Sequence, residues 1–216
     1  MFITFEGMEG CGKSTQARSL ALGLERCSVP HVLTIEPGGT RIGGVIRSIL
    51  LDGRNHDLSA LAELLLYTAD RAQHVKEVIE PALDQGKWVV CDRFFDATTV
   101  YQGHARGQDM ALIRALNNKV THGVSPDITF LLDCPVDIGL ERALRREARR
   151  DIPRVGTQDR FEKEEREFHQ AVREGYLSIA GEEQDRFVVL DSRLKEHELE
   201  KLIFKHISPF LPVNSA

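Results

Sequence analysis

Gly7-Met8-Glu9-Gly10-Cys11-Gly12-Lys13-Ser14-Thr15 follows a short apolar run and precedes a segment of good helix-forming residues. It fits G-x-x-x-x-G-K-[ST], a phosphate-binding loop between a strand and a helix. Its glycines let backbone N–H groups and the N-terminus of the next helix approach a phosphate closely. Lys13 supplies a positive charge for the β- and γ-phosphates, and the Ser14 hydroxyl is placed to bind Mg²⁺. The stretch predicts a nucleotide site in a fold of parallel strands and helices.

The apolar runs that flank this loop predict the rest of the fold. Strands are expected at residues 1–6, 31–35, 87–92, 127–133 and 186–191. Helices are expected at 13–26, 42–51, 58–85, 98–121, from Pro135 onward, 160–180 and 194–206, with a bend or end at Pro81 and interruptions at Gly103 and Gly107. The strand at 87–92 is too apolar for a wet face, which places it at the centre of a parallel sheet. We therefore predict an α/β fold in one domain, residues 1–216, with a doubly wound five-stranded parallel sheet and helices on both faces.

Composition narrows the class of protein. The formal net charge of −5 argues against a general nucleic-acid binder. No apolar stretch reaches 18 residues, and the sequence begins directly with a predicted strand, so neither a membrane span nor a signal peptide is expected. The four cysteines form no C-x-x-C pair, which predicts reduced, mostly buried thiols and a cytoplasmic protein. Cys11 is the exception, because its thiolate would be favoured inside an anion-binding loop.

Aspartates end three of the predicted strands, at positions 92, 133 and 191. An acid after an apolar strand is the expected Mg²⁺ partner of a phosphate-binding loop. Asp92 is the preferred candidate because Arg93 follows it and could clamp a phosphate with two hydrogen bonds. The alternative is a local ion pair between Asp92 and Arg93. For Asp133 and Asp191, a capping role is the favoured interpretation.

A basic segment stands out in a chain that is acidic overall. Residues 140–160 contain seven arginines: Arg142, Arg145, Arg146, Arg149, Arg150, Arg154 and Arg160. A solvated helix face accounts for part of this set. Residues 149–156 combine charge with turn residues, which is typical of a closing lid, placed at about 145–160. A lid that excludes water favours a phosphotransferase over a hydrolase.

Five motifs together resemble bacterial thymidylate kinase: Gly7 to Thr15, Glu36-Pro37-Gly38-Gly39-Thr40, Ala69-Asp70-Arg71-Ala72-Gln73-His74, Asp92-Arg93-Phe94, and the basic segment ending Asp159-Arg160-Phe161-Glu162. The similarity runs in order from residue 2 to about 192. It implies transfer of the γ-phosphate of ATP to dTMP with Mg²⁺, and usually a homodimer. We expect the long helix that starts at Leu58 to contribute to the dimer interface.

The resemblance also assigns roles to individual residues. Glu9 would face the deoxyribose, Arg71 would grip the dTMP phosphate, and Tyr67 would stack on the base. The dTMP site would thus comprise Glu9, Pro37, Tyr67, Arg71, Arg93, Thr98 and Tyr101, and the ATP site Gly7, Gly10, Cys11, Gly12, Lys13, Ser14 and Thr15. Ser14 and Asp92 would bind the metal, and the catalytic set would be Lys13, Arg93 and Arg146. The loop has no arginine, so Arg146 best matches a lid arginine, with Arg142 and Arg150 as alternatives.

Three positions depart from the family pattern. Ile35 replaces a common arginine, and Ala97 and Thr99 replace common serine and amide side chains. All three lie around the expected acceptor nucleotide. Two alternatives to dTMP kinase therefore stay open, another nucleoside monophosphate kinase and a nucleotide-binding regulatory protein without turnover.

Overall fold

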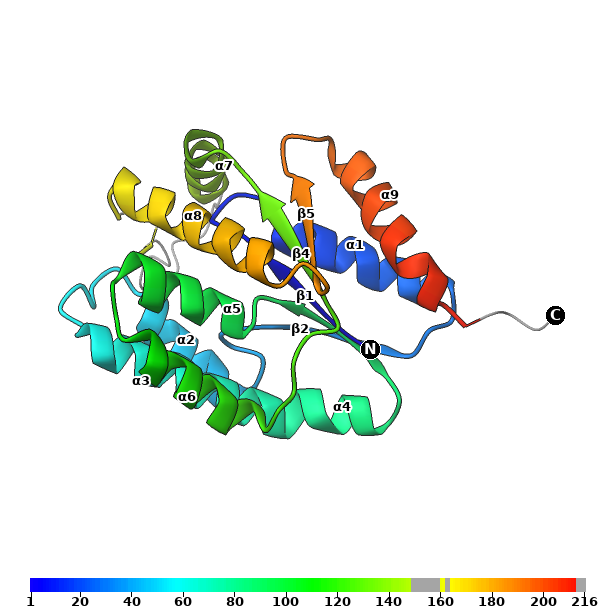
Figure 1. Ribbon diagram of the computed structural model, residues 1–216, viewed down its shortest axis with the longest axis horizontal. Coiled ribbons are helices and arrows are strands. Elements are labelled where there is room, and N and C mark those ends of the chain that lie inside the picture. The colour runs from blue at the N-terminus through cyan, green and yellow to red at the C-terminus, as the bar shows by residue number, and fades with distance from the viewer. Residues whose placement is uncertain (149–159, 162–163, 213–216) are drawn as a thin grey trace.

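A single five-stranded parallel sheet forms the centre of the computed structural model, which describes residues 1–148, 160–161 and 164–212 (Figure 1). Its strands are β1 (Phe2–Glu6), β2 (His31–Ile35), β3 (Trp88–Asp92), β4 (Ile128–Asp133) and β5 (Phe187–Asp191). They lie in the order β2-β3-β1-β4-β5. The predicted fold class is confirmed, and the order places the phosphate-binding loop, which follows β1, at the middle of the sheet.

Every residue of β1 is buried, as its apolar sequence predicts. β1 pairs with β3 from Phe2↔Val89 onward and with β4 from Ile3↔Ile128 onward. The Thr4 and Thr129 hydroxyls lie 2.8 Å apart, so these polar groups within the sheet satisfy each other. A strand with neighbours on both edges and helices on both faces leaves little freedom to the loop that follows it.

Helices cover both faces of the sheet (Figure 1). On one face α1 (Lys13–Arg26) contacts β1, β2 and β3, and α9 (Glu196–Ile207) packs on α1. On the other face α8 (Arg166–Glu182) contacts β4 and β5, and α4 (Glu80–Asp84) contacts β3. Side chains alternate accordingly along β1. Phe5 stacks on Phe130 in the cluster shared with α1, whereas Phe2 packs with residues of β3 and with Phe94.

The remaining helices surround the carboxyl ends of β2, β3 and β4. They are α2 (Arg41–Leu51), α3 (Ala60–His74), α5 (Phe95–Thr98), α6 (Met110–Thr121) and α7 (Val136–Ala148), together with two π-helical turns, η1 (Val75–Ile79) and η2 (Thr99–Ala105). A 3₁₀ turn, η3 (Ser208–Phe210), follows α9 and packs on it. α3 lies between α2 and α6. One face of α3 can therefore reach a site at the sheet's edge while another faces outward.

Two predicted helix boundaries were wrong. The expected helix at 58–85 is helical from 60 to 84, as α3, the turn η1 and then α4, and η1 leads directly into the turn of α4 that contains Pro81. Gly103 does not interrupt a helix but lies inside η2, where an added Cβ would come within 2.3 Å of the Met110 sulfur. Gly107 does mark the break, with φ +67°. α8 begins at Arg166, six residues later than expected.

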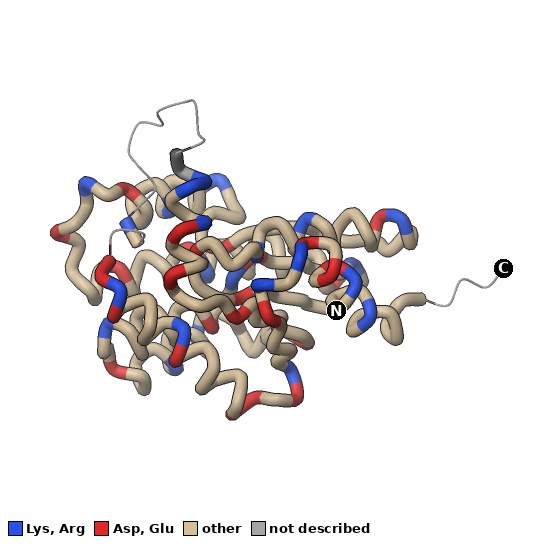
Figure 2. The backbone as a smooth tube through the Cα atoms, turned by 90° about the horizontal axis from the view of Figure 1, so that it is seen from above, with Lys and Arg blue, Asp and Glu red and all other residues tan. Residues whose placement is uncertain are grey.

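In the view of Figure 2, basic and acidic residues are interspersed over the described part of the chain. This mixture agrees with the prediction from net charge. No helix in the described residues is long and apolar enough to cross a membrane. Of the predicted lid, residues 149–159, with Arg149, Arg150 and Arg154, lie outside the described part.

Candidate active site

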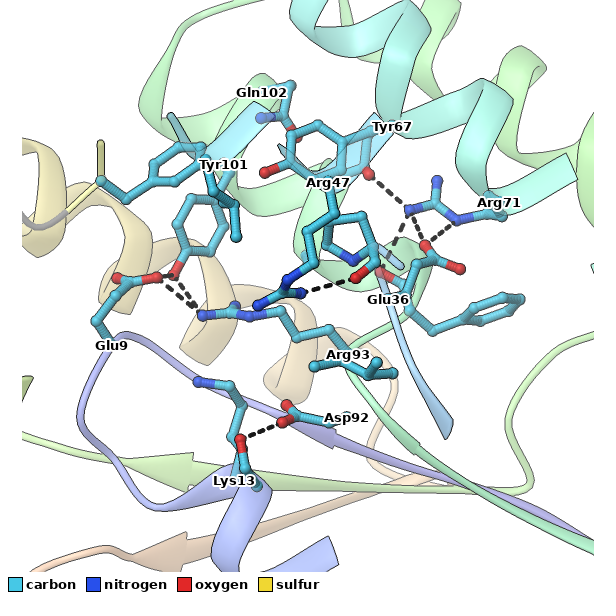
Figure 3. Close-up of a pocket in the computed structure, with 18 of the residues that line it drawn as sticks. Glu9, Lys13, Glu36, Arg47, Tyr67, Arg71, Asp92, Arg93, Tyr101 and Gln102 are labelled. Carbon is cyan, nitrogen blue, oxygen red and sulfur yellow. Dashed lines mark hydrogen bonds and ion pairs between the residues drawn. The ribbon is translucent and has the colours of Figure 1, made fainter. Parts of the chain in front are cut away.

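One cavity opens beyond the carboxyl ends of β1, β2 and β3 (Figure 3). Most of the site residues predicted from sequence line it: Glu9, Gly10, Lys13, Ser14, Pro37, Tyr67, Arg71, Asp92, Arg93, Thr98, Tyr101 and Arg146. Gly7, Cys11, Gly12 and Thr15 do not, and their predicted contribution is through the backbone of the loop. The structure therefore brings the expected donor and acceptor residues to a single space.

The loop owes its shape to glycine. Gly7, Gly10 and Gly12 all have positive φ, at +133°, +71° and +101°, a region that other residues rarely adopt. A Cβ at Gly10 would lie 2.0 Å from the carbonyl oxygen of Gly139 in α7. No side chain fits there, which agrees with the expectation that any arginine must come from elsewhere. α1 then begins at Lys13 without a side-chain cap at Gly12, so its first N–H groups can face an anion.

Two oxygen ligands suited to Mg²⁺ meet at the end of the loop. The Ser14 hydroxyl donates a short hydrogen bond to Asp92 Oδ2. A hydroxyl and a carboxylate match the preference of Mg²⁺ for a few hard oxygen ligands completed by water and phosphate oxygens. The donor set therefore fits the metal. Beside it the Lys13 ammonium donates to the Met8 carbonyl at 2.7 Å and lies 3.5 Å from the buried Cys11 sulfur.

Glu9, Arg93 and Tyr101 form a compact polar cluster in the cavity (Figure 3). Arg93 Nη2 donates to Glu9 Oε1 at 2.9 Å and to the Tyr101 hydroxyl at 3.1 Å, and Tyr101 donates to the same Glu9 oxygen at 2.6 Å. Arg93 thus pairs with Glu9, so the proposed local ion pair with Asp92 is absent among the described contacts. His169 Nδ1 lies 3.6 Å from Glu9 Oε2, beyond hydrogen-bond distance.

These neighbours decide the charge state of Glu9. Burial alone would raise the pKa of its carboxyl, but the His169 ring and the charges of Arg93 and Lys13 outweigh burial and hold this pKa well below its usual range. Burial likewise opposes the charge on Arg93, while the neighbouring Tyr101, Tyr176 and Glu9 raise its pKa. The cluster therefore presents an ionised carboxylate and a permanent cation to the cavity.

Arg71 is almost fully buried, with 1% of its surface exposed. Its Nε donates to Glu36 Oε1 at 2.7 Å, and Nη2 lies 2.5 Å from the same oxygen. Nη1 donates to Asn117 and Nη2 to the Thr98 hydroxyl, at 2.7 and 2.8 Å. The guanidinium predicted to grip a phosphate is thus held rigidly at the cavity wall. Thr98, predicted to belong to the dTMP site, also supports Arg71.

Tyr67 lies one helical turn before Arg71 on α3 and faces the same cavity. Burial raises the pKa of its hydroxyl, which stays neutral. That hydroxyl makes no hydrogen bond to any described residue. Opposite, Arg47 of α2 donates from Nη1 to the Pro37 carbonyl at 2.7 Å. An aromatic ring and planar cations around one space suit a nucleobase with its phosphate.

The described arginines of the basic segment lie in different environments. Arg146 on α7 lines the cavity, whereas Arg142 donates to the Ser192 carbonyl at 2.9 Å. Arg160 lies 2.5 Å from Glu63, and Arg145 pairs with Glu141 on the helix surface. Arg150, the other alternative for the catalytic role, lies outside the described residues.

The other two strand-end aspartates lie in ion pairs. Asp133 accepts two hydrogen bonds from Arg173, at 2.7 and 2.8 Å. Asp191 accepts from the backbone N–H and the guanidinium of Arg193. Neither residue lines the cavity. The expected capping role fits Asp191, which accepts a backbone N–H, but not Asp133, whose carboxylate accepts only from the Arg173 side chain among the described contacts.

Several residues of the site were missed in the sequence. Glu36, Arg47, Gln102 and Phe161 line the cavity, and Asn117, His169, Tyr176 and Glu6 support its residues. A signal existed for three of them, since Glu36 and Phe161 lie in quoted motifs and Arg47 is a cation in the middle of an otherwise apolar stretch. The others resemble ordinary helix residues and are recognisable only by their contacts.

Comparison with known proteins gives consistent matches. A family model described as thymidylate kinase matches residues 5–203. The thymidylate kinases of Trichlorobacter lovleyi and Desulfosudis oleivorans are 51% and 55% identical over 203 and 192 residues, covering 94% and 89% of this chain and the same shares of theirs. A crystal structure of thymidylate kinase from Ehrlichia chaffeensis superposes with a TM-score of 0.76 at 34% identity, covering 96% of this chain and 98% of that one.

Proposed function

Because the chain belongs to the thymidylate kinase family, we propose that its cavity holds dTMP beside ATP and that the residues around it divide the work of phosphoryl transfer. The reaction is the ATP-dependent phosphorylation of dTMP to dTDP. One observation carries the assignment of roles. Lys13 and Ser14 of the phosphate-binding loop line the same cavity as Glu9, Arg71 and Arg93, so donor and acceptor phosphates can meet.

In the proposed complex, Arg71 binds the dTMP phosphate and Tyr67 packs against the base. Pro37, Thr98 and Tyr101 complete the walls, and Glu9 faces the deoxyribose. The backbone of residues 7–15 holds the ATP phosphates. Arg71 is already oriented by Glu36 and Asn117, so binding requires little reordering of this side chain.

An oxygen of the dTMP phosphate attacks the γ-phosphorus of ATP, the bond from that phosphorus to the β,γ-bridging oxygen breaks, and ADP leaves. Lys13, Arg93 and Arg146 stabilise the negative charge that is spread over the transferred group and the leaving oxygen. Ser14 and Asp92 would hold Mg²⁺, which supplies further charge neutralisation on the phosphates when bound.

The acceptor is tested by a coupled assay of ADP release with ATP and a panel of dTMP, dUMP, UMP, CMP and AMP. We expect turnover with dTMP and at least about tenfold lower kcat/KM with every other acceptor. A preference for another nucleotide would identify a different monophosphate kinase, the class left open by Ile35 and Ala97, which both line the cavity. Binding of dTMP without turnover would favour a regulatory protein.

We also propose a homodimer formed through α2, α3 and α6. These neighbouring helices expose large apolar side chains: Ile42, Val45, Ile49, Leu61, Leu65 and Leu112. Contiguous apolar surface of this kind is typical of an interface. Analytical ultracentrifugation should give a dimer at micromolar concentration and a monomer for Leu65→Glu. A wild-type monomer would contradict the proposal.

The whole of residues 1–216 is proposed to form one kinase domain, with residues 145–160 as its lid insert. A cytoplasmic location is proposed from the four cysteines, which are free thiols in the structure, as expected in a reducing compartment. Labelling of unfolded protein with a thiol reagent, without prior reduction, should modify all four cysteines. Protection of a pair would contradict this location.

A further inference from the structure

Next to the Glu9–Arg93 pair, the core holds a buried carboxyl group that the proposed mechanism does not use. Glu6, the last residue of β1, is completely buried. Its Oε1 accepts from the Phe94 N–H at 2.7 Å, and its Oε2 accepts from the Tyr176 hydroxyl at 2.7 Å. Both oxygens are therefore used, and neither points to the cavity. A buried carboxylate is costly unless its hydrogen bonds are of structural or functional value.

Both partners of Glu6 adjoin Arg93. Phe94 is the next residue in the chain, and the Tyr176 hydroxyl accepts from Arg93 Nη1 at 3.1 Å. One carboxyl group thus contacts the backbone next to Arg93 directly and its guanidinium through the Tyr176 hydroxyl. Tyr176 is 1% exposed and comes from α8, so its ring is fixed by the core.

The backbone of Arg93 needs such support. Its φ of +74° lies in the left-handed region, which is unfavourable for a residue with a side chain. The Arg93 N–H donates to the Phe5 carbonyl at 3.0 Å, and the following N–H donates to Glu6. Two consecutive residues of β1 therefore hold the two amides that flank this strained position. A strained backbone conformation of this kind persists only where the surrounding structure holds it in place.

The guanidinium is oriented by three groups. Nη2 is used by Glu9 and the Tyr101 hydroxyl, both of which line the cavity, whereas Nη1 is used by Tyr176. Substrate can replace the contacts on the cavity side. The contact with Tyr176 lies behind Arg93, in the core, and can persist while the cation meets a phosphate.

We propose that Glu6 and Tyr176 are positioning residues for Arg93, acting as a relay from β1 through the Tyr176 hydroxyl to the guanidinium. The inference rests on the proposed catalytic role of Arg93. Preorganised charges stabilise a transition state because they need no reorientation during the reaction. Loss of the relay should therefore lower kcat more than it changes KM for dTMP.

The test is a double-mutant cycle between Tyr176→Phe and Arg93→Ala. Tyr176→Phe keeps the ring and removes one hydroxyl, and we expect kcat to fall about fivefold to tenfold, as for one hydrogen bond, with KM for dTMP changed less than about twofold. In the Arg93→Ala background, itself about a hundredfold slower, the same substitution should change kcat by less than about 1.5-fold. Such non-additivity is the mark of action through Arg93.

Glu6→Gln, which keeps the shape of the side chain, should show the same pattern and serves as a second variant if Tyr176→Phe does not fold. Arg173→Gln is the matched control, because Arg173 lies on the same helix but pairs with Asp133, and it should keep kcat within about twofold. An equal loss of kcat in both backgrounds, or no loss in the first, would overturn the relay. Near-normal turnover of Arg93→Ala would instead overturn the proposed role of Arg93.

Discussion

The phosphate-binding loop presents backbone groups from nine consecutive residues, 7–15, whereas the acceptor side of the cavity presents side chains from β2, α3 and the end of β3. The loop depends on three glycines with positive φ. The acceptor side depends on buried ion pairs, above all Arg71 with Glu36, whose side chains are 1% and 2% exposed. The loop is shaped by the conformation of a few consecutive residues, whereas the acceptor side is assembled from residues far apart in the sequence.

The cations of the two regions, Lys13 and Arg71, therefore differ in what they do for the folded protein besides their proposed contact with phosphate. Lys13 makes one hydrogen bond to a carbonyl and forms no ion pair with a carboxylate among the described residues, although its charge helps to keep Glu9 ionised. Arg71 neutralises Glu36 inside the protein and connects α3 with α5 and α6 through Thr98 and Asn117. Removing either charge should impair the reaction, but only removal of Arg71 should also lower the free energy of unfolding substantially.

Arg71→Met should have the largest effect on stability. It leaves the Glu36 carboxylate buried without its partner, and loss of one member of a buried pair costs about 3–5 kcal/mol. Urea unfolding followed by circular dichroism measures the change. The double variant Glu36→Gln/Arg71→Met should recover at least half of the loss. A cost below about 1 kcal/mol would show that the acceptor side is no more dependent on ion pairing than the loop.

Lys13→Ala should reverse the balance of effects. We expect kcat to fall about a hundredfold or more, equivalent to about 2.7 kcal/mol of transition-state stabilisation. Its free energy of unfolding should change by less than about 1.5 kcal/mol, since only one hydrogen bond to a carbonyl is lost. Steady-state kinetics and urea unfolding of the same preparation check both values. Near-normal turnover would remove Lys13 from the catalytic set.

The pH dependence of the free energy of unfolding should report on Glu6, the buried acid at the end of β1. Burial first, and then Asp96, raises the pKa of Glu6 from 4.5 to about 8. Between pH about 4.5 and 8, Glu6 therefore keeps its proton in the folded protein and has lost it in the unfolded protein. Stability contributed by this proton should fall as pH rises through that window, at up to about 1.4 kcal/mol per pH unit.

Glu6→Gln should flatten this profile between pH 7 and 8, where the carboxyl of Asp70, whose pKa burial raises to about 6, is already mostly ionised. Urea unfolding of both proteins at four pH values in this range makes the comparison. Identical slopes would mean that the hydrogen bonds from Phe94 and Tyr176 outweigh burial and keep Glu6 ionised.

Tyr67→Phe should have the smallest effect. The Tyr67 hydroxyl makes no hydrogen bond to the described residues, and the ring remains, so kcat and KM for dTMP should stay within about twofold. Tyr101→Phe is the matched comparison, because that hydroxyl bonds both Glu9 and Arg93, and its kinetic effect should be clearly larger. Equal effects would mean that Tyr67 binds substrate through its hydroxyl.

Much of this protein could be predicted from local sequence. Apolar runs located all five strands, and the nonapeptide located the loop. Asp92, which ends β3, and Arg93, which follows it, were placed correctly at the cavity. Residues at the end of a buried parallel strand lie at the carboxyl edge of the sheet, where ligands bind. The helix boundaries near Gly103 and Arg166 were less predictable, since π-helical turns depend on how neighbouring helices pack.

The supporting residues could not be predicted in this way. Glu6 and Tyr176 are 170 positions apart, and Arg71 and Asn117 are 46 apart. In the sequence, Glu6 is the end of an apolar strand, Tyr176 an aromatic on a helix face and Asn117 a polar helix residue. Nothing in their spacing links them to an arginine elsewhere.

The sequence by itself determined the sheet, the loop and which residues carry charge to the ends of the strands, because these follow from hydrophobic periodicity and from the backbone freedom of glycine within a few residues. Only the tertiary structure decided how Arg71 and Arg93 are held. Their partners come from β1, the turn after β2, α6 and α8, and a buried charge is stabilised by whichever groups the packing brings to it rather than by its neighbours in the chain.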